Sequence, residues 1–381
     1  MFALRAARLF DGNTFVSDAV VVIDGSRIQA VGSDAPPGVD VEDLGDVTLM
    51  PGLIDTHQHL CFDGSGPLEE QVGGVPDEAL LERARGNALR ALLAGITTIR
   101  DLGDRDFVTL PLRGTPGLPT ILVAGPPLTR DAGHCWYLGG CCNGREDLVA
   151  AVHERHRRGC DVVKIMVTGG ALTPGFAMWD SQFDTDDVAA VVETAHELGL
   201  PVAAHCHGTD GIVTAVEARV DTIEHCTFFT SGARSEPDAR VIEAIAQAGV
   251  RVSATLGRHP EHRPPPAIEA NLPVVLGAFR QLHEAGGVIV VGTDAGVGPA
   301  KPHDILPHAA KDLAEIGITG TDMLATLTSR AAAACGVGDR KGRLAAGADA
   351  DLLAVRGDPA REPAALLDVH GVWLAGAWVP R

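Results

Sequence analysis

Eight short runs of apolar, largely β-branched residues follow one another through the middle of the chain and alternate with helix-like segments. Strands that alternate with helices are typical of βα units and a parallel sheet. Eight such units over roughly 250 residues predict an α/β fold, a TIM-like (β/α)8 barrel. The expected strands are 54–59, 97–101, 120–124, 162–167, 202–206, 222–226, 250–254 and 288–294, and the expected helices include 77–94, 146–158, 186–198, 237–248 and 272–285.

Both ends of the chain have a different pattern, with short strands and tight turns. Asp24-Gly25 lies between two apolar runs, which is a strong hairpin signal. The C-terminal segment repeats this pattern of short strands. We therefore predict a small, discontinuous β-sandwich domain formed by residues 1–50 and 340–381, with the metal-binding barrel domain at 51–339 between its two halves.

Composition excludes several classes of protein. The 381 residues are 45% hydrophobic and 21% charged, which is enough for a large core, and the net charge of −19 would repel a phosphate backbone. Arg5 and Arg8 interrupt the apolar start, so it does not resemble a secretory signal, and no uncharged stretch is long enough to span a membrane. We expect a cytoplasmic protein without nucleic-acid or membrane partners, whose eight cysteines are reduced.

The first barrel strand ends in His57-Gln58-His59. Side chains two residues apart on a strand project from the same face, so both imidazoles can bind one metal ion. The alternative is a pair of unrelated surface histidines at a strand end. Metal binding is favoured because catalytic residues of such barrels follow the strands, and further ligand-type residues recur there, namely Lys164, His205, His225 and Asp294.

This pattern, flanked by β-rich ends, resembles the amidohydrolase superfamily of metal-dependent hydrolases. Segments 51–57 and 342–352 extend the likeness over nearly the whole chain. Segments 164–170 and 205–208 are similar to one branch in particular. That branch contains imidazolonepropionase-like proteins and Xaa-Pro or arginine/lysine carboxypeptidase-like dipeptidases.

The resemblance implies two divalent metal ions, with zinc expected. His57, His59 and Asp294 would bind one ion, His205 and His225 would bind the other, and a carboxylated Lys164 would bridge the two. Carboxylation converts a buried cation, which is costly, into an anionic oxygen ligand. The alternative is an ordinary lysine beside a single ion.

The resemblance also implies roles in catalysis. Two cations that share a water would hold it as a bridging hydroxide near neutral pH and polarise a substrate carbonyl. Asp294 would act as metal ligand and general acid–base. His207 would contact the scissile carbonyl or, alternatively, orient a metal ligand, and His134 resembles a carbonyl-contacting histidine of the related dipeptidases.

Two loops are expected to shape the substrate pocket, because loops over a barrel mouth usually do so. In loop 125–140, Trp136 and Tyr137 could wall the pocket, or Trp136 could simply pack the loop down. In loop 256–266, Arg258 could bind a substrate carboxylate. An ordinary solvated loop is the alternative there, and the same two readings cover His259, His262, Arg263, Lys301, His303 and His308.

The sequence therefore predicts a metal-dependent amidohydrolase that hydrolyses an amide or peptide C–N bond in a small peptide or N-acyl amino acid, including a modified peptide of a biosynthetic pathway. One alternative is a cyclic amidase of the imidazolonepropionase type. An alternative of another class is a catalytically inactive barrel that binds a ligand. The expected partner is a small molecule or peptide, and a homo-oligomer is compatible with the pattern.

Overall fold

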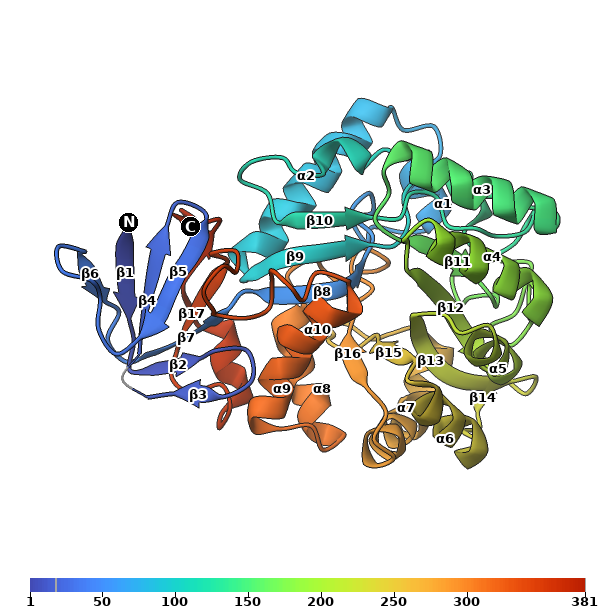
Figure 1. The fold of residues 1–381 in the computed structure, drawn as a ribbon. Helices are drawn as coiled ribbons and strands as arrows, with labels where there is room; N and C mark the ends of the chain where they lie inside the picture. Colours follow the sequence, from blue (N-terminus) through green and yellow to red (C-terminus); the bar gives the residue numbers. More distant parts are fainter. Residues whose placement is uncertain (18, 381) are drawn as a thin grey trace.

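The computed structural model describes residues 1–17 and 19–380 and is an α/β protein (Figure 1). A parallel strand is present at each of the eight predicted runs, although the last strand is shorter than expected. These strands are β8 (Leu53–Gln58), β9 (Ile96–Asp101), β10 (Thr120–Val123), β11 (Val163–Met166), β12 (Val202–Gly208), β13 (Thr222–Thr230), β15 (Arg251–Ala254) and β16 (Ile289–Val291).

The eight strands form two sheets, in the orders β10-β9-β8 and β11-β12-β13-β15-β16, and every neighbouring pair in these orders is parallel. The short β14 (Arg234–Ser235) adds an antiparallel pair to β13. Isolated parallel bridges join Gln58 to Ala295 and Leu128 to Ile165, so each end of one sheet is linked to the other sheet. Because the strands are parallel, their carboxyl ends meet at one edge.

Helices follow most of these strands and cover them on the outside (Figure 1). In α4, the buried Val188, Val191, Val192 and Ala195 follow the three- and four-residue spacing of one helix face. Helix α7 begins at Pro266, six residues before the expected start, because proline suits a first helical turn that needs no N–H donor. The helices are α1 (Leu68–Val72), α2 (Asp77–Leu93), α3 (Arg145–Arg158), α4 (Thr185–Glu197), α5 (Thr209–Glu217), α6 (Ala239–Ala248), α7 (Pro266–Glu284), α8 (Ala309–Glu315), α9 (Gly320–Leu327) and α10 (Ser329–Ala334). Within the described part of the chain, none of them combines the length and the apolar character that crossing a membrane requires.

The two ends of the chain pair with each other at one side of the molecule (Figure 1). One sheet has the order β5-β4-β1-β6, and the other has the order β19-β18-β17-β7-β2-β3. The predicted hairpin is present, with Gly25 at the turn between β4 and β5. These strands are β1 (Phe2–Arg5), β2 (Arg8–Phe10), β3 (Phe15–Val16), β4 (Val20–Asp24), β5 (Arg27–Gly32), β6 (Val41–Asp43), β7 (Val47–Pro51), β17 (Leu352–Arg356), β18 (Val369–Leu374) and β19 (Ala377–Trp378).

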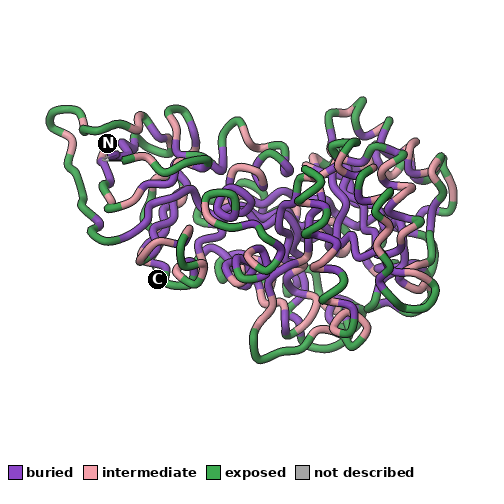
Figure 2. Tube along the Cα trace, turned by 90° about the horizontal axis from the view of Figure 1, so that it is seen from below, coloured by how far each residue is buried: buried purple, intermediate pink, exposed green. Residues whose placement is uncertain are grey.

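Strand β17 contributes to two hydrophobic cores. Leu352 and Ala354 pack in a small cluster between the two end sheets, whereas Leu353 and Val355 pack in the large cluster around the parallel strands. This division follows from the two-residue period of a strand, which sends alternate side chains to opposite faces. The buried segments accordingly run through the end sheets as well as the larger part of the molecule (Figure 2).

The core position of Leu353 leads to a stability prediction. The side chain is fully buried, so Leu353→Ala leaves a cavity and should lower the free energy of unfolding by about 2–5 kcal/mol. Urea unfolding followed by circular dichroism measures this change. As a control, Leu89→Ala removes a side chain that is 40% exposed on α2 and should cost far less. Equal losses in the two variants would contradict the core assignment.

Candidate metal centre

The first group of ligand-type residues lies where β8 and β16 end. His57 Nε2 is 3.2 Å from His59 Nε2, and Asp294 Oδ1 is 3.4 Å and 3.3 Å from these two atoms. Asp294 adopts a left-handed φ of 60°, and its N–H donates to the His57 carbonyl oxygen at 2.8 Å. A non-glycine residue in this conformation is strained, and such strain concentrates at functional sites. The three potential donor atoms therefore converge on one point.

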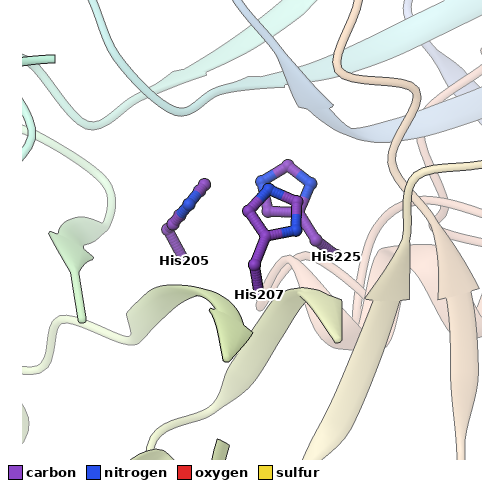
Figure 3. Close-up of side chains that lie close together, drawn as sticks. All are labelled: His205, His207 and His225. Carbon is purple, nitrogen blue, oxygen red and sulfur yellow. The ribbon is translucent and has the colours of Figure 1, made fainter. Parts of the chain in front are cut away.

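The second group comes from the neighbouring strands β12 and β13. His205, His207 and His225 each offer a ring nitrogen, and these atoms lie within 4.8 Å of one another. The rings of His207 and His225 are stacked with their centroids 4.5 Å apart, and the ring of His205 is steeply inclined to both (Figure 3). The structure thus brings together His205 and His225, as the sequence predicts, and places His207 directly beside them.

Lys164, in β11, is 1% exposed, and its Nζ has no hydrogen-bond partner among residues 1–17 and 19–380. An unpaired ammonium in such a position is costly. Burial, opposed by the charges of Glu224 and Asp294, lowers the pKa of Lys164 to about 8, so the neutral amine is more accessible than in an exposed lysine. A buried, unpartnered amine between two groups of metal-ligand residues fits a lysine that is carboxylated and shared by two cations.

Most of these histidines are held in the neutral form that binds metal; at His59 the Asp294 carboxylate outweighs burial and raises the pKa. Burial, followed by the nearby Lys164, lowers the pKa of His57 to about 4, and burial lowers the pKa of His207 to about 4 as well. Carbonyl oxygens of Gly103 and Gly169 lie 3.0 Å from His59 Nδ1 and 3.1 Å from His205 Nε2. Because a carbonyl oxygen only accepts, these nitrogens carry the hydrogen, and the other nitrogen of each ring offers its lone pair.

Two further acidic residues lie behind this centre, and the sequence analysis did not single them out. Glu224, directly before His225, is fully buried and pairs with Arg100 at 2.8 Å. Asp101 ends β9, and neither of its carboxylate oxygens has a hydrogen-bond partner within the described residues. A charged residue inside an apolar strand is the sequence signal that could have identified both of them.

A cavity of about 870 Å³ opens over the centre. Its floor contains both histidine groups, Lys164 and Asp294, so a small molecule in the cavity would contact the metal-ligand residues directly. Volumes of this size are typical of small-molecule sites. Many of the other lining residues are apolar, including Phe62, Leu68, Met166, Leu172, Ile268 and Leu272.

Some of the residues predicted to contact substrate line this cavity, and others do not. Arg258 lines it, and so does His134, whose Nδ1 lies 3.0 Å from the Thr173 hydroxyl. Trp136 and Tyr137 are not among the lining residues, and Trp136 is 40% exposed. Their expected contact with substrate stays a prediction, since the loop directs Cys135 toward the cavity in their place.

The other polar residues of the expected mouth are divided in the same way. Arg263 and Lys301 line the cavity, whereas His259, His262, His303 and His308 do not. His303 is buried and engages the Gln58 side chain at 3.0 Å and the Phe62 carbonyl oxygen at 2.9 Å. These contacts support the end of β8, so the role of His303 is to hold the strand that carries His57.

These features are those of a metal-dependent hydrolase at the carboxyl ends of parallel strands. The sequence model of the Amidohydrolase family matches residues 48–379, and the chain belongs to this family. It is therefore a hydrolase that acts on carbon–nitrogen bonds. The predicted superfamily and branch are confirmed by the relatives that follow.

Three similar proteins illustrate the branch. Imidazolonepropionase from Deinococcus deserti is 27% identical over an alignment that covers 98% of this chain and 93% of that protein. The crystal structure of a Xaa-Pro dipeptidase with bound methionine in the active site is similar with a TM-score of 0.86 and 27% identity, over 100% of both chains. That of a prolidase complexed with N-methylphosphonate-L-proline has a TM-score of 0.86 and 25% identity, over 100% of this chain and 99% of that chain.

The isolated carboxylate of Asp101 leads to a pH prediction for the metal-free protein. Burial, followed by the neighbouring Asp104, raises the pKa of Asp101 to about 7. A carboxyl whose folded pKa exceeds its unfolded value contributes stability at low pH that is lost as pH rises toward the folded pKa. Relative to the wild type, Asp101→Asn should therefore raise the free energy of unfolding more at pH 8 than at pH 5. The difference should be a few kcal/mol, because one pKa unit corresponds to about 1.4 kcal/mol.

Thermal unfolding at both pH values measures this difference. Asp186→Asn, at a side chain that is 84% exposed, is the control and should behave like the wild type at both. The prediction fails if Asp101→Asn changes stability equally at pH 5 and pH 8.

Proposed function

We propose that this protein is a binuclear, metal-dependent amidohydrolase that cleaves an amide or peptide C–N bond in an N-acyl amino acid or small peptide. The observation that carries the proposal is that Lys164, buried and without a hydrogen-bond partner among the described residues, lines the same cavity as the two groups of metal-ligand side chains. We also propose that the eight parallel strands form one closed barrel spanning 51–339, and that 1–50 and 340–381 form the β-sandwich domain.

The residues that would hold the ions are those predicted from the sequence. His57, His59 and Asp294 would bind one ion, and His205 and His225 the second, with a carboxylated Lys164 between them. When bound, two zinc ions would lower the pKa of a water molecule and polarise the substrate carbonyl. His207 lies within reach of the second group, so it would either join that ion or contact the carbonyl.

Asp294 is suited to move the proton in this reaction. Burial alone would raise the pKa of Asp294, but the imidazoles of His57 and His59 hold it below its usual range, so the carboxylate is ionised. It lines the cavity and can accept a proton from the attacking water, then deliver it to the departing amine. His134 and His207, whose Nδ1 atoms face Thr173 and Thr227, would direct Nε2 toward the carbonyl oxygen.

The charges around the cavity favour a substrate with a free carboxylate. Besides Lys164, the basic side chains that line it are Arg258, Arg263 and Lys301. Lys301 Nζ already donates to the carbonyl oxygens of Thr255 at 3.0 Å and Gly257 at 2.7 Å. Among the described residues, the shortest ion pair of the Arg258 guanidinium is the one with Asp312 at 3.9 Å, so Arg258 is the better placed to bind a carboxylate.

The same cavity has few carboxylates that could pair with a free α-ammonium group. Among the described lining residues, Asp294 and Asp312 are the only acids. Asp312 Oδ2 accepts the Gly257 N–H at 2.9 Å, and Oδ1 lies 3.9 Å from Arg258. An ammonium group would therefore lose its hydration without a free carboxylate to pair with. An N-acylated amino acid, with its amine blocked and an apolar acyl group, fits this cavity better than a dipeptide with a free amine.

Two other functions were predicted as alternatives. The similarity to imidazolonepropionase supports a cyclic amidase, which the same residues could serve. An inactive, ligand-binding barrel is less well supported, because each of the predicted ligand residues is present and located at the site.

A matched pair of substrates tests the proposed function. Zinc-loaded protein should hydrolyse N-acetyl-Gly-Phe with a kcat/KM at least tenfold higher than Gly-Phe, because the two differ only in the blocked amine. Asp294→Asn is the control and should retain metal but lose turnover by about 10²–10⁴-fold. Faster hydrolysis of an imidazolone ring than of either compound would favour the cyclic amidase, and absence of both turnover and stoichiometric metal would favour the inactive barrel.

The proposed bridge has a separate test. Lys164→Ala removes the bridging group, so the variant should bind at least one ion fewer by elemental analysis. Added short carboxylates such as acetate or propionate should partly restore both metal and activity, because they can occupy the space of the carbamate. Full metal occupancy in the variant would contradict the bridge. Thermal unfolding provides the control that Lys164→Ala is folded.

A further inference from the structure

We propose that Glu224, held in place by Arg100, is the positioning residue that sets the ring orientation and tautomer of His57 for metal binding. His57 Nδ1 and Glu224 Oε2 lie 3.0 Å apart, and the side chains are 1% and 0% exposed. Within the described residues neither atom has another partner. Because buried polar atoms need partners, this close approach pairs the two atoms with each other.

Glu224 is fixed from its other side. Its Oε1 accepts from Arg100 at 2.8 Å and from the Thr222 hydroxyl at 2.6 Å. The Nε of the same guanidinium donates to the carbonyl oxygen of Thr56 at 2.7 Å. Thr56 directly precedes His57, so one arginine on β9 ties the backbone of β8 to the carboxylate on β13. The acceptor that faces His57 is therefore rigid.

The geometry of the ion pair between Arg100 and Glu224 leaves one carboxylate oxygen facing His57. An arginine and a carboxylate can form two parallel hydrogen bonds. Here only Oε1 faces the guanidinium, and the Nη1 atom of Arg100 has no partner in the described structure. Oε2 faces the imidazole instead. If the pair served packing alone, both carboxylate oxygens would be expected to accept from the guanidinium of Arg100.

The chemistry follows from the donors and acceptors. A carboxylate accepts hydrogen bonds and cannot donate, so Nδ1 of His57 must carry the hydrogen. The lone pair is then on Nε2, which faces His59 and Asp294 at 3.2 Å and 3.4 Å. Asp294 faces both His57 and His59, but only His57 among these described histidines has an anion at its other ring nitrogen. The corresponding nitrogens of His59 and His205 face carbonyl oxygens, and those of His207 and His225 face hydroxyls. Such partners orient a ligand and raise its basicity.

Glu224→Gln separates this role from simple space filling. Arg100 can only donate, so the amide oxygen of glutamine must face Arg100, and its NH₂ group must face His57. Nδ1 would then have to accept, which places the hydrogen on Nε2, where the metal should bind. The substitution keeps the shape of the side chain and reverses the tautomer.

The test measures metal affinity and needs no substrate. Metal-free wild type and Glu224→Gln are titrated with cobalt in competition with a chelator, and the visible cobalt spectrum is recorded. One of the two equivalents should bind about 10–100-fold more weakly in Glu224→Gln, with an altered spectrum, while the other equivalent is unchanged. Glu197→Gln, an exposed carboxylate at the end of α4, should bind both equivalents like the wild type.

Two double variants show whether Glu224 acts through His57. In a His57→Ala background, Glu224→Gln should cause no further loss of affinity. In Arg100→Met/Glu224→Gln, the amide is free to turn its oxygen toward His57, so part of the lost affinity should return. Wild-type affinity in Glu224→Gln, an equal loss in the His57→Ala background, or a change confined to the unfolding temperature would overturn the proposal.

This inference rests on the ion-binding part of the proposed function and not on the choice of substrate. If the amide substrates are not hydrolysed but cobalt binds as described, the positioning role stands. If the wild type binds no cobalt at all, both fall.

Discussion

The site depends on the parallel hydrogen-bonded register of the strands. Met166 lies opposite His205, and Cys206 lies opposite His225, so residues far apart in sequence reach the same edge. Apolar side chains on the other face anchor these strands in the large core, where Cys206 and Cys226 are buried. Any slip of one residue would turn the histidines into that core. The hydrophobic packing of the strands therefore decides where the polar groups meet.

Concentrating so many polar groups on one floor has an electrostatic consequence. Burial lowers the pKa of His57, His205, His207 and His225, whereas the Asp294 carboxylate outweighs burial at His59 and raises its pKa. Asp294 and Glu224 stay ionised because cations or imidazoles face them. Lys164 feels the charges of Glu224 and Asp294, but its Nζ has no hydrogen-bond partner among the described residues. A buried amine without a hydrogen bond, beside histidine lone pairs directed at shared points, is the arrangement that divalent ions and a carbamate would complete. Arg258 and several apolar side chains line the same cavity, where the proposed substrate would bind.

Much of this organisation could be predicted from local patterns. The two-residue spacing of His57 and His59, and the alternation of strands and helices, depend only on the periodicity of each element. Strand β16 is shorter than expected, since the chain turns at Asp294 with a positive φ, and α7 starts earlier than expected at Pro266. Such differences arise at element ends, where tertiary contacts outweigh propensity.

The sequence by itself determined the alternation of strands and helices and the shared face of His57 and His59, because both follow from short-range spacing. The resemblance of its motifs indicated the family and the further ligand-type residues. Only the tertiary structure decided that Glu224 faces His57 and that Arg100, 124 residues away from Glu224, holds it there. It also decided that His207 joins the second group, and that Arg258 but not Trp136 lines the cavity. These contacts depend on the register between strands and on the folding of loops, which no local periodicity encodes.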